Sequence, residues 1–198
     1  MKNALMTIFL AIFVVLMAAV FLWQPLTIPF SKASITNDFV LQTTEGALDS
    51  KLLRGKVLAL FFGYAGCGDE CGTRLEKLKK SYEMLHPGDR AQVRIIIVTV
   101  DPERDTPARI GEYAHGIHRD FIGATGKPED IKAMAEAFAV NYAKHTLADG
   151  SYIVQTSPMI YVVDAEGKFA SVLNDNLPVD KTADALRSRV PTPQLPGK

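Results

Sequence analysis

The sequence contains few residues that carry metal or redox chemistry, and its charge is not biased toward either sign. Its 198 residues include two cysteines and four histidines, and 22 Lys and Arg balance 22 Asp and Glu. Because the positive charges form no basic stripe, we expect no nucleic-acid partner. No internal repeat or low-complexity tract occurs, and the length suits one domain with an appendage.

Charged side chains are also missing from Asn3 to Ser31, and the run 4–23 has Thr7 as its one polar residue. At about 1.5 Å per residue this run spans roughly 30 Å, the thickness of a bilayer core. A cleaved signal peptide would have a shorter apolar run, of about 7–15 residues, followed by a small-residue cleavage site. We therefore predict an uncleaved transmembrane helix in residues 1–24; a buried core helix is the alternative.

The rest of the chain follows this predicted anchor. Lys2 precedes the apolar run, which favours a cytoplasmic N-terminus and a domain on the other side of the membrane. We expect a single-pass protein of the inner (cytoplasmic) membrane whose domain faces the periplasm or another extracytoplasmic space. The predicted parts are a linker at 25–37, a domain at 38–190 and a loose, proline-rich tail at 191–198.

Strand-type and helix-type hydrophobic patterns alternate along the chain, which predicts an α/β domain. Continuous apolar runs indicate strands buried on both faces, and the amphipathic segments have helical spacing. The expected strands are 39–41, 57–62, 93–100, 152–154, 159–163 and 169–172, and the expected helices are 72–85, 107–117, 128–138 and 179–189. This order is typical of a thioredoxin-like fold, a central mixed sheet flanked by helices.

The two cysteines, Cys67 and Cys71, lie between the end of a predicted buried strand and the start of a helix. Unpaired N–H groups at a helix N-terminus favour thiolates, which bind soft metals and attack disulfides. A bridge between residues four apart closes too small a loop to be an effective structural staple. Gly66, Gly68 and Gly72 leave room for a partner to approach, which disfavours the alternative of two ordinary buried cysteines.

Three ordered segments resemble the Sco/SenC family. Residues 62–71 (FGYAGCGDEC) resemble the family's FGYT-x-C-P-D-x-C-P loop, residues 98–107 are similar to its VDPERDTP segment, and residues 121–140 resemble its FxGLTG helix. The resemblance covers most of residues 38–173. It implies a membrane-anchored protein of thioredoxin fold that supports copper supply to cytochrome c oxidase.

The departures from the family pattern concern the site itself. Both loop prolines are replaced, by Gly68 and Gly72, and Thr156 stands where the family's Y-x-V-D-H-[ST] segment has a copper-binding histidine. A hydroxyl is a poor ligand for soft Cu(I), so the three-ligand copper site is not carried over. Pro158 resembles the cis-proline that faces the redox cysteines of thioredoxin-like reductases. X-Pro bonds are mostly trans, so both isomers stay open.

His145 is the one histidine considered as a substitute copper ligand, because it lies in the connection leading to Thr156. His115 and His118 are three residues apart and could clasp a metal, although solvation at a helix end is the favoured interpretation. His86 is interpreted as a partner of a helix dipole.

Two acidic residues are predicted to lie near the sulfurs. Asp69 is inside the cysteine loop, and Asp101 follows the strongest strand, at an edge where ligands bind in α/β sheets. Capping or solvation explains Asp69 equally well. Arg104 and Asp105 are predicted to be structural and to tie this loop to the next helix.

A cysteine pair at a helix start is compatible with three functions. In thiol–disulfide exchange Cys67 attacks a partner's disulfide, Cys71 resolves the mixed disulfide, and Pro158 faces the pair. The expected partner is an exported copper protein or a cytochrome c oxidase subunit. The alternative is a Cu(I) chaperone that holds copper between Cys67 and Cys71, with His145 as a possible third ligand. Peroxide reduction ranks last because no peroxide-pocket pattern is present.

Overall fold

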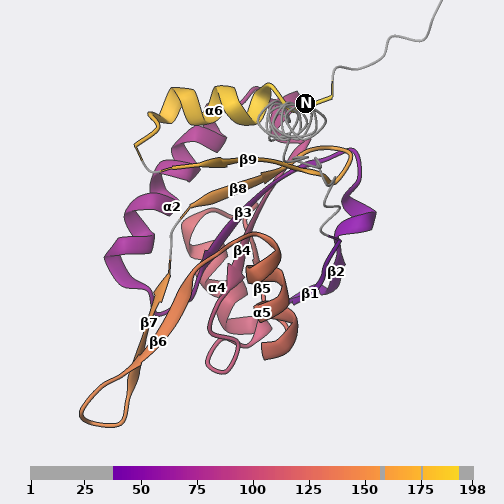
Figure 1. Ribbon diagram of the computed structural model, residues 1–198. Helices are drawn as coiled ribbons and strands as arrows, with labels where there is room; N and C mark the ends of the chain where they lie inside the picture. The colour runs from indigo at the N-terminus through magenta and orange to yellow at the C-terminus, as the bar shows by residue number, and fades with distance from the viewer. Residues whose placement is uncertain (1–37, 157–158, 175, 192–198) are drawn as a thin grey trace, which may run out of the picture. The chain divides into compact units, whose positions relative to one another are not determined.

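A computed structural model of the chain describes residues 38–156, 159–174 and 176–191 (Figure 1). The predicted anchor and linker and nearly all of the predicted tail therefore lie outside the described residues. Among the helices that are described, none combines the length and apolarity needed to cross a bilayer.

A five-stranded mixed sheet with the order β5-β4-β3-β8-β9 forms the centre of the domain. Its two middle strands, β3 (Val57–Gly63) and β4 (Val93–Thr99), run parallel and are almost wholly buried. Strand β5 (Ile122–Ala124) forms one edge and runs parallel to β4. On the other side β8 (Ile160–Val163) runs antiparallel to β3 and pairs with the antiparallel edge strand β9 (Phe169–Leu173). The predicted mixed sheet is confirmed.

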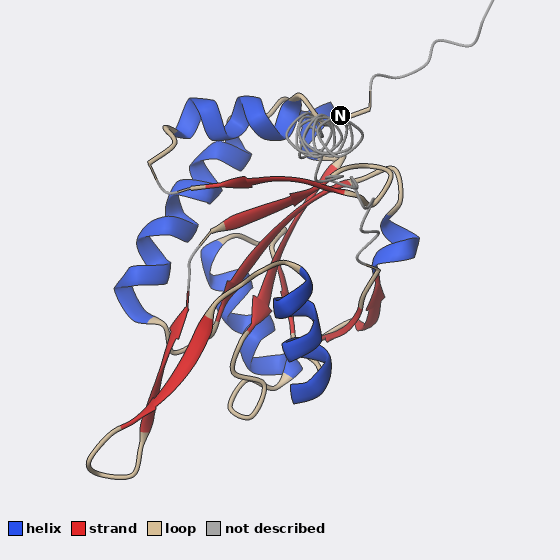
Figure 2. Cartoon of the chain, viewed as in Figure 1, coloured by secondary structure: helices blue, strands red, loops and turns tan. Residues whose placement is uncertain are grey.

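Helices cover both faces of this sheet (Figure 2). One face packs against α2 (Gly68–Glu83), α4 (Pro107–Ile117) and α6 (Val179–Arg187), and the other against α5 (Pro128–Ala137). Because side chains alternate along a strand, Phe61 joins the first core and Phe62 the second. Thr106 caps α4, since its hydroxyl accepts a hydrogen bond from the Arg109 N–H at 3.3 Å.

Several elements differ from the sequence-based expectation. Helix α2 begins at Gly68, four residues earlier than predicted, so Cys71 lies inside its first turns. After α2 the chain forms a short helix that was not predicted, α3 (Pro87–Arg90), in which a proline suits the first position.

Two hairpins were not predicted as pairs. The first joins β1 (Val40–Thr43) to β2 (Gly46–Asp49) and leads into a short 3-10 helix, η1 (Ser50–Leu53). The second joins β6 (Tyr142–Thr146) to β7 (Tyr152–Thr156) and projects from the domain (Figure 1). Strand β6 has almost no buried residue, so it lacks the apolar alternation by which strands are recognised.

Candidate thiol and copper site

Cys67 and Cys71 are joined by a disulfide, with their Cα atoms 5.7 Å apart. Strand β3 ends at Gly63, and a turn closed by a 3.1 Å hydrogen bond from the Cys67 N–H to the Tyr64 carbonyl leads into α2. Cys67 is the N-cap residue of α2 and is half-buried, whereas Cys71 is fully buried. The structure thus brings the two predicted sulfurs together and leaves only one of them partly accessible.

Cys71 is held in the core by close packing. It belongs to the apolar cluster that also contains Phe61 and Leu75. Gly63 faces this cluster, and a Cβ added to it would lie 3.4 Å from the Cys71 sulfur and 2.9 Å from the Phe61 ring. A side chain at position 63 would therefore displace the buried sulfur or the ring.

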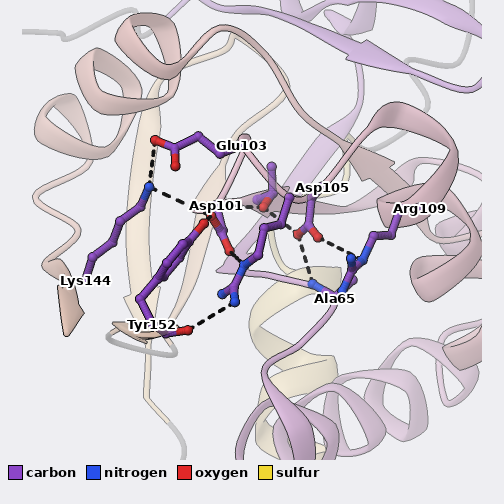
Figure 3. Close-up of polar contacts among 9 residues, drawn as sticks. Ala65, Asp101, Glu103, Asp105, Arg109, Lys144 and Tyr152 are labelled. Atoms are coloured by element: carbon purple, nitrogen blue, oxygen red, sulfur yellow. Dashed lines mark hydrogen bonds and ion pairs between the residues drawn. The ribbon is translucent and has the colours of Figure 1, made fainter. Parts of the chain in front are cut away.

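A buried carboxylate fastens the cysteine loop to the sheet. Asp105 is 1% exposed, and its Oδ2 accepts hydrogen bonds from the Ala65 N–H at 2.9 Å and from the Thr99 hydroxyl at 2.7 Å. Its Oδ1 forms an ion pair with Arg109 Nε at 3.4 Å (Figure 3). Burial raises the pKa of the nearby Tyr113, and the negative charge of Asp105 adds to this. Asp105 thus connects β4, α4 and the loop that carries Cys67.

Asp101 is fully buried and lies at the centre of a second polar cluster (Figure 3). It accepts hydrogen bonds from Arg104 Nε and from the Tyr152 hydroxyl, the latter at 2.8 Å. Arg104 also donates to the Tyr152 carbonyl at 3.1 Å, and its guanidinium lies 4.0 Å from the centre of that ring. Lys144 pairs with Glu103 at 2.7 Å and lies 4.0 Å from Asp101. These contacts tie the turn after β4 to the β6–β7 hairpin.

The charges of this cluster shift the pKa values of its members. Burial raises the pKa of Tyr152, and the hydrogen bond to the Asp101 carboxylate raises it further. For Arg104, burial alone would lower the pKa, but the hydrogen bond and charge of Asp101 outweigh it, so the pKa is raised. The same balance, with Glu103 as the main partner, raises the pKa of Lys144. All three side chains thus keep their protons at neutral pH.

Thr156 ends β7 next to the strand from which the cysteine loop departs. Its hydroxyl donates a hydrogen bond to the Phe62 carbonyl at 3.4 Å, one residue before the end of β3. The hydroxyl at the position where the resemblance implies a histidine is therefore hydrogen-bonded to the backbone of β3.

His145 lies on β6 with an exposed side chain. Its cross-strand partner is Ile153, which is 50% exposed, whereas Val154 is buried. Since neighbouring residues of a strand point to opposite faces, Thr156 shares the face of Val154 and His145 lies on the other face. The structure does not bring His145 to the sulfurs, and the described residues include no group of three or more His, Cys, Asp or Glu able to hold a metal.

The other histidines have structural surroundings. His118 packs against the rings of Tyr82 and Phe121, at centroid distances of 5.3 and 5.1 Å. His115 is exposed near the end of α4. His86 was predicted to lie at the C-terminal end of a helix and to interact with its dipole. It is instead the N-cap residue of α3.

Two remaining predictions concern the cysteine loop. Asp69 lies exposed in the first turn of α2, where an acidic side chain suits the helix dipole. Pro158 lies outside the described residues, so its position and its peptide isomer stay predictions.

Comparisons with known proteins identify the family. A family model described as SCO1/SenC matches residues 29–191. The chain belongs to the SCO1/SenC family. Among its relatives, "Protein SCO1 homolog 1, mitochondrial" of Arabidopsis thaliana is 34% identical over 156 residues, which are 78% of this chain and 47% of the relative. "Protein SCO1, mitochondrial" of Saccharomyces cerevisiae is 29% identical over 172 residues, 83% of this chain and 58% of the relative. The chain therefore spans about half the length of these curated relatives.

Solved structures of the family have the same fold. Arabidopsis thaliana ScoI with copper bound matches with a TM-score of 0.69 at 32% identity, covering 77% of this chain and 96% of that one. Bradyrhizobium japonicum ScoI with copper bound matches with a TM-score of 0.70 at 31% identity, covering 77% and 97%. The thioredoxin-like fold of SCO1/SenC proteins is thus confirmed for this chain.

Several residues that shape the site carry no functional signal in their local sequence. Tyr152 and Lys144 come from the unpredicted hairpin, and nothing in their local sequence connects them to Asp101. Thr99 and Gly63 end the two central strands, and their positions directly before the turn and the loop were the available signal.

Proposed function

We propose that the protein performs thiol–disulfide exchange on the cysteines of copper-site proteins through the pair Cys67 and Cys71. The observation that carries this proposal is the unequal exposure of the bridged sulfurs: Cys67 is half-buried at the start of α2, and Cys71 is fully buried. A partner's sulfur can approach Cys67, whereas buried Cys71 is inaccessible to the partner and can resolve the mixed disulfide formed at Cys67.

The reaction starts from the reduced pair. The Cys67 thiolate, favoured by the N–H groups at the helix start, attacks one sulfur of the partner's disulfide, and the other sulfur leaves as a thiolate. The Cys71 thiolate then attacks Cys67, closes the Cys67–Cys71 disulfide and releases the partner's second thiolate. The partner gains two electrons, and the protein is oxidised to the form described above. A dithiol reductant of the same compartment then restores the reduced pair.

The substrate class follows from family membership and from relatives that were solved with copper bound. We infer that the targets are the copper-site cysteines of an exported copper protein or of a cytochrome c oxidase subunit, which must be reduced before they bind metal. The predicted helix in residues 4–23 would hold the domain on the extracytoplasmic side of the inner membrane. Protease protection in spheroplasts tests this topology, and digestion of the domain only after lysis would refute it.

A Cu(I) chaperone is the second candidate. A disulfide offers no thiolate, but its two-electron reduction yields two, and this donor set suits Cu(I). The Thr156 hydroxyl is hydrogen-bonded to the Phe62 carbonyl, and His145 lies on the opposite face of the hairpin from Thr156. Both observations favour a copper site made of two sulfurs, with poor affinity for Cu(II). On this candidate copper is the cargo, and no electron transfer to a partner occurs.

One experiment separates the two candidates. The reduced full-length protein is mixed anaerobically with the oxidised two-cysteine copper-site domain of an oxidase subunit, and free thiols on each protein are counted by alkylation and mass. In parallel, Cu(I) is titrated against a chelator. Stoichiometric reduction of the domain, abolished by Cys67→Ser, supports exchange. Tight Cu(I) binding without reduction supports the chaperone. Equal Cu(I) affinity in His145→Ala and the unmodified protein is expected for a two-sulfur site, whereas a weaker affinity would restore His145 as a ligand.

A further inference from the structure

An uninterrupted α-helix cannot carry a disulfide between residues four apart. Within a helix the Cα–Cβ bonds at positions i and i+4 point in the same direction, and their Cβ atoms lie about 5–6 Å apart. A disulfide needs Cβ atoms about 3.5–4.5 Å apart. The bridge between Cys67 and Cys71 therefore requires the helical path to break between the two residues.

The break lies at Gly68. Its φ is +65°, in the left-handed region, although it directly follows Cys67, which has right-handed values of φ −69° and ψ −14°. Cys71 is fixed in the apolar core, so the side that adjusts is the one carrying Cys67. In a continuous helix the Cα–Cβ bond of Cys67 would be parallel to that of Cys71. The left-handed conformation of Gly68 changes the orientation of Cys67, so that the two bonds are no longer parallel.

We propose that Gly68 is a hinge coupled to the redox state of the cysteine pair: left-handed in the disulfide form and right-handed helical in the dithiol form. The inference rests on the proposed exchange function. Reduction breaks the bond between the two sulfurs, so the disulfide no longer prevents residues 67 and 68 from adopting a helical conformation. Helix α2 then gains backbone hydrogen bonds at its N-terminal end. The conformational preference of residue 68 then sets how readily the disulfide is reduced.

Gly72 provides a matched control within the same helix. It is the second position at which the resemblance places a proline in the family, but its φ is not in the left-handed region. A Cβ at either glycine would meet no atom within 4 Å, so an alanine acts through the backbone and not through a clash. A proline at position 68 is confined to φ near −65°, so a disulfide between Cys67 and Cys71 would then require a change in the backbone conformation of other residues.

The redox equilibrium of the full-length protein with dithiothreitol tests this hinge. A dithiothreitol thiolate attacks Cys67, Cys71 leaves, and the second dithiothreitol thiolate releases reduced Cys67; alkylation then measures the ratio of dithiol to disulfide. Gly68→Ala is expected to shift the equilibrium about tenfold toward the dithiol, or about 30 mV, because alanine resists the left-handed conformation. Gly68→Asn should shift it less, since asparagine tolerates that region, and Gly72→Ala should shift it less than about twofold.

Thermal unfolding of both redox forms separates a hinge from a general loss of stability. Gly68→Ala should lower the Tm of the disulfide form and leave that of the dithiol form unchanged or raised, because alanine favours a helix. Equal losses in both forms, an unchanged equilibrium, or an equal shift in Gly72→Ala would overturn the hinge. Failure of the proposed function is a different result, in which the unmodified protein equilibrates with dithiothreitol but does not reduce the copper-site domain.

Discussion

Replacing Asp105 by alanine removes the acceptor that the Ala65 N–H and the Thr99 hydroxyl share. A hydrogen bond to a charged group contributes about 1.5–3 kcal/mol, and an unpaired buried donor costs about 1–3 kcal/mol. Thr99 is fully buried, so its hydroxyl bears the full loss, whereas Ala65 is only half-buried and its N–H can reach water. We expect Asp105→Ala to lower the free energy of unfolding by about 3 kcal/mol.

In a domain of this size, 1 kcal/mol corresponds to about 2–4 °C in Tm, so the expected decrease is about 6–12 °C. Thermal unfolding followed by circular dichroism measures it. Asp105→Asn keeps an acceptor of the same shape and should lose about 1 kcal/mol. Arg109→Ala removes an ion pair whose cation is 52% exposed and should cost less than about 1 kcal/mol. If Asp105→Ala unfolds within 2 °C of the unmodified protein, or no lower than Arg109→Ala, the carboxylate does not fasten the loop.

Two further substitutions and one pH titration test other parts of this account. Tyr152→Phe removes a hydrogen bond to buried Asp101 and should lower the free energy of unfolding by about 1–2 kcal/mol in a urea titration; an unchanged midpoint would contradict the role of that cluster. Gly63→Ala places a Cβ 2.9 Å from the Phe61 ring and should cost about 1–3 kcal/mol in the same titration, a loss that Gly72→Ala should not show. Burial is the largest cause of a raised pKa at four tyrosines: Tyr82, Tyr113, Tyr152 and Tyr161. Because the folded chain holds these protons more tightly than the unfolded chain, their stabilisation is complete below about pH 10 and is lost as the pH rises further. Phenolate absorbance rising for all tyrosines near pH 10 without unfolding would contradict this.

Much of the fold could be predicted because its central elements have strong local signals. Strands β3 and β4 consist of continuous apolar runs, which are typical of strands buried on both faces. Thr106 followed by Pro107 is a clear signal for a helix start. Strand β6 carries no such signal. Its residues are almost all exposed, and the strand is defined by pairing with β7, which is a tertiary property.

The cysteine pair could also be predicted, because the order of strand, glycine-rich loop and helix places both thiols at a helix start. The conformation of the loop could not. Sequence shows that Gly68 permits a positive φ, but only the structure shows that this glycine has one and Gly72 does not. His145 was considered as a ligand because of its nearness in sequence to Thr156, and strand alternation places the two on opposite faces.

Trapping of the mixed disulfide tests the central claim most directly. The reduced Cys71→Ser and Cys67→Ser variants are each mixed with the oxidised copper-site domain, quenched with acid and separated without reductant. The account predicts a covalent adduct of the two proteins with Cys71→Ser, because accessible Cys67 attacks and no resolving sulfur is present, and no adduct with Cys67→Ser. Equal adducts from both variants, or none from either, would contradict it.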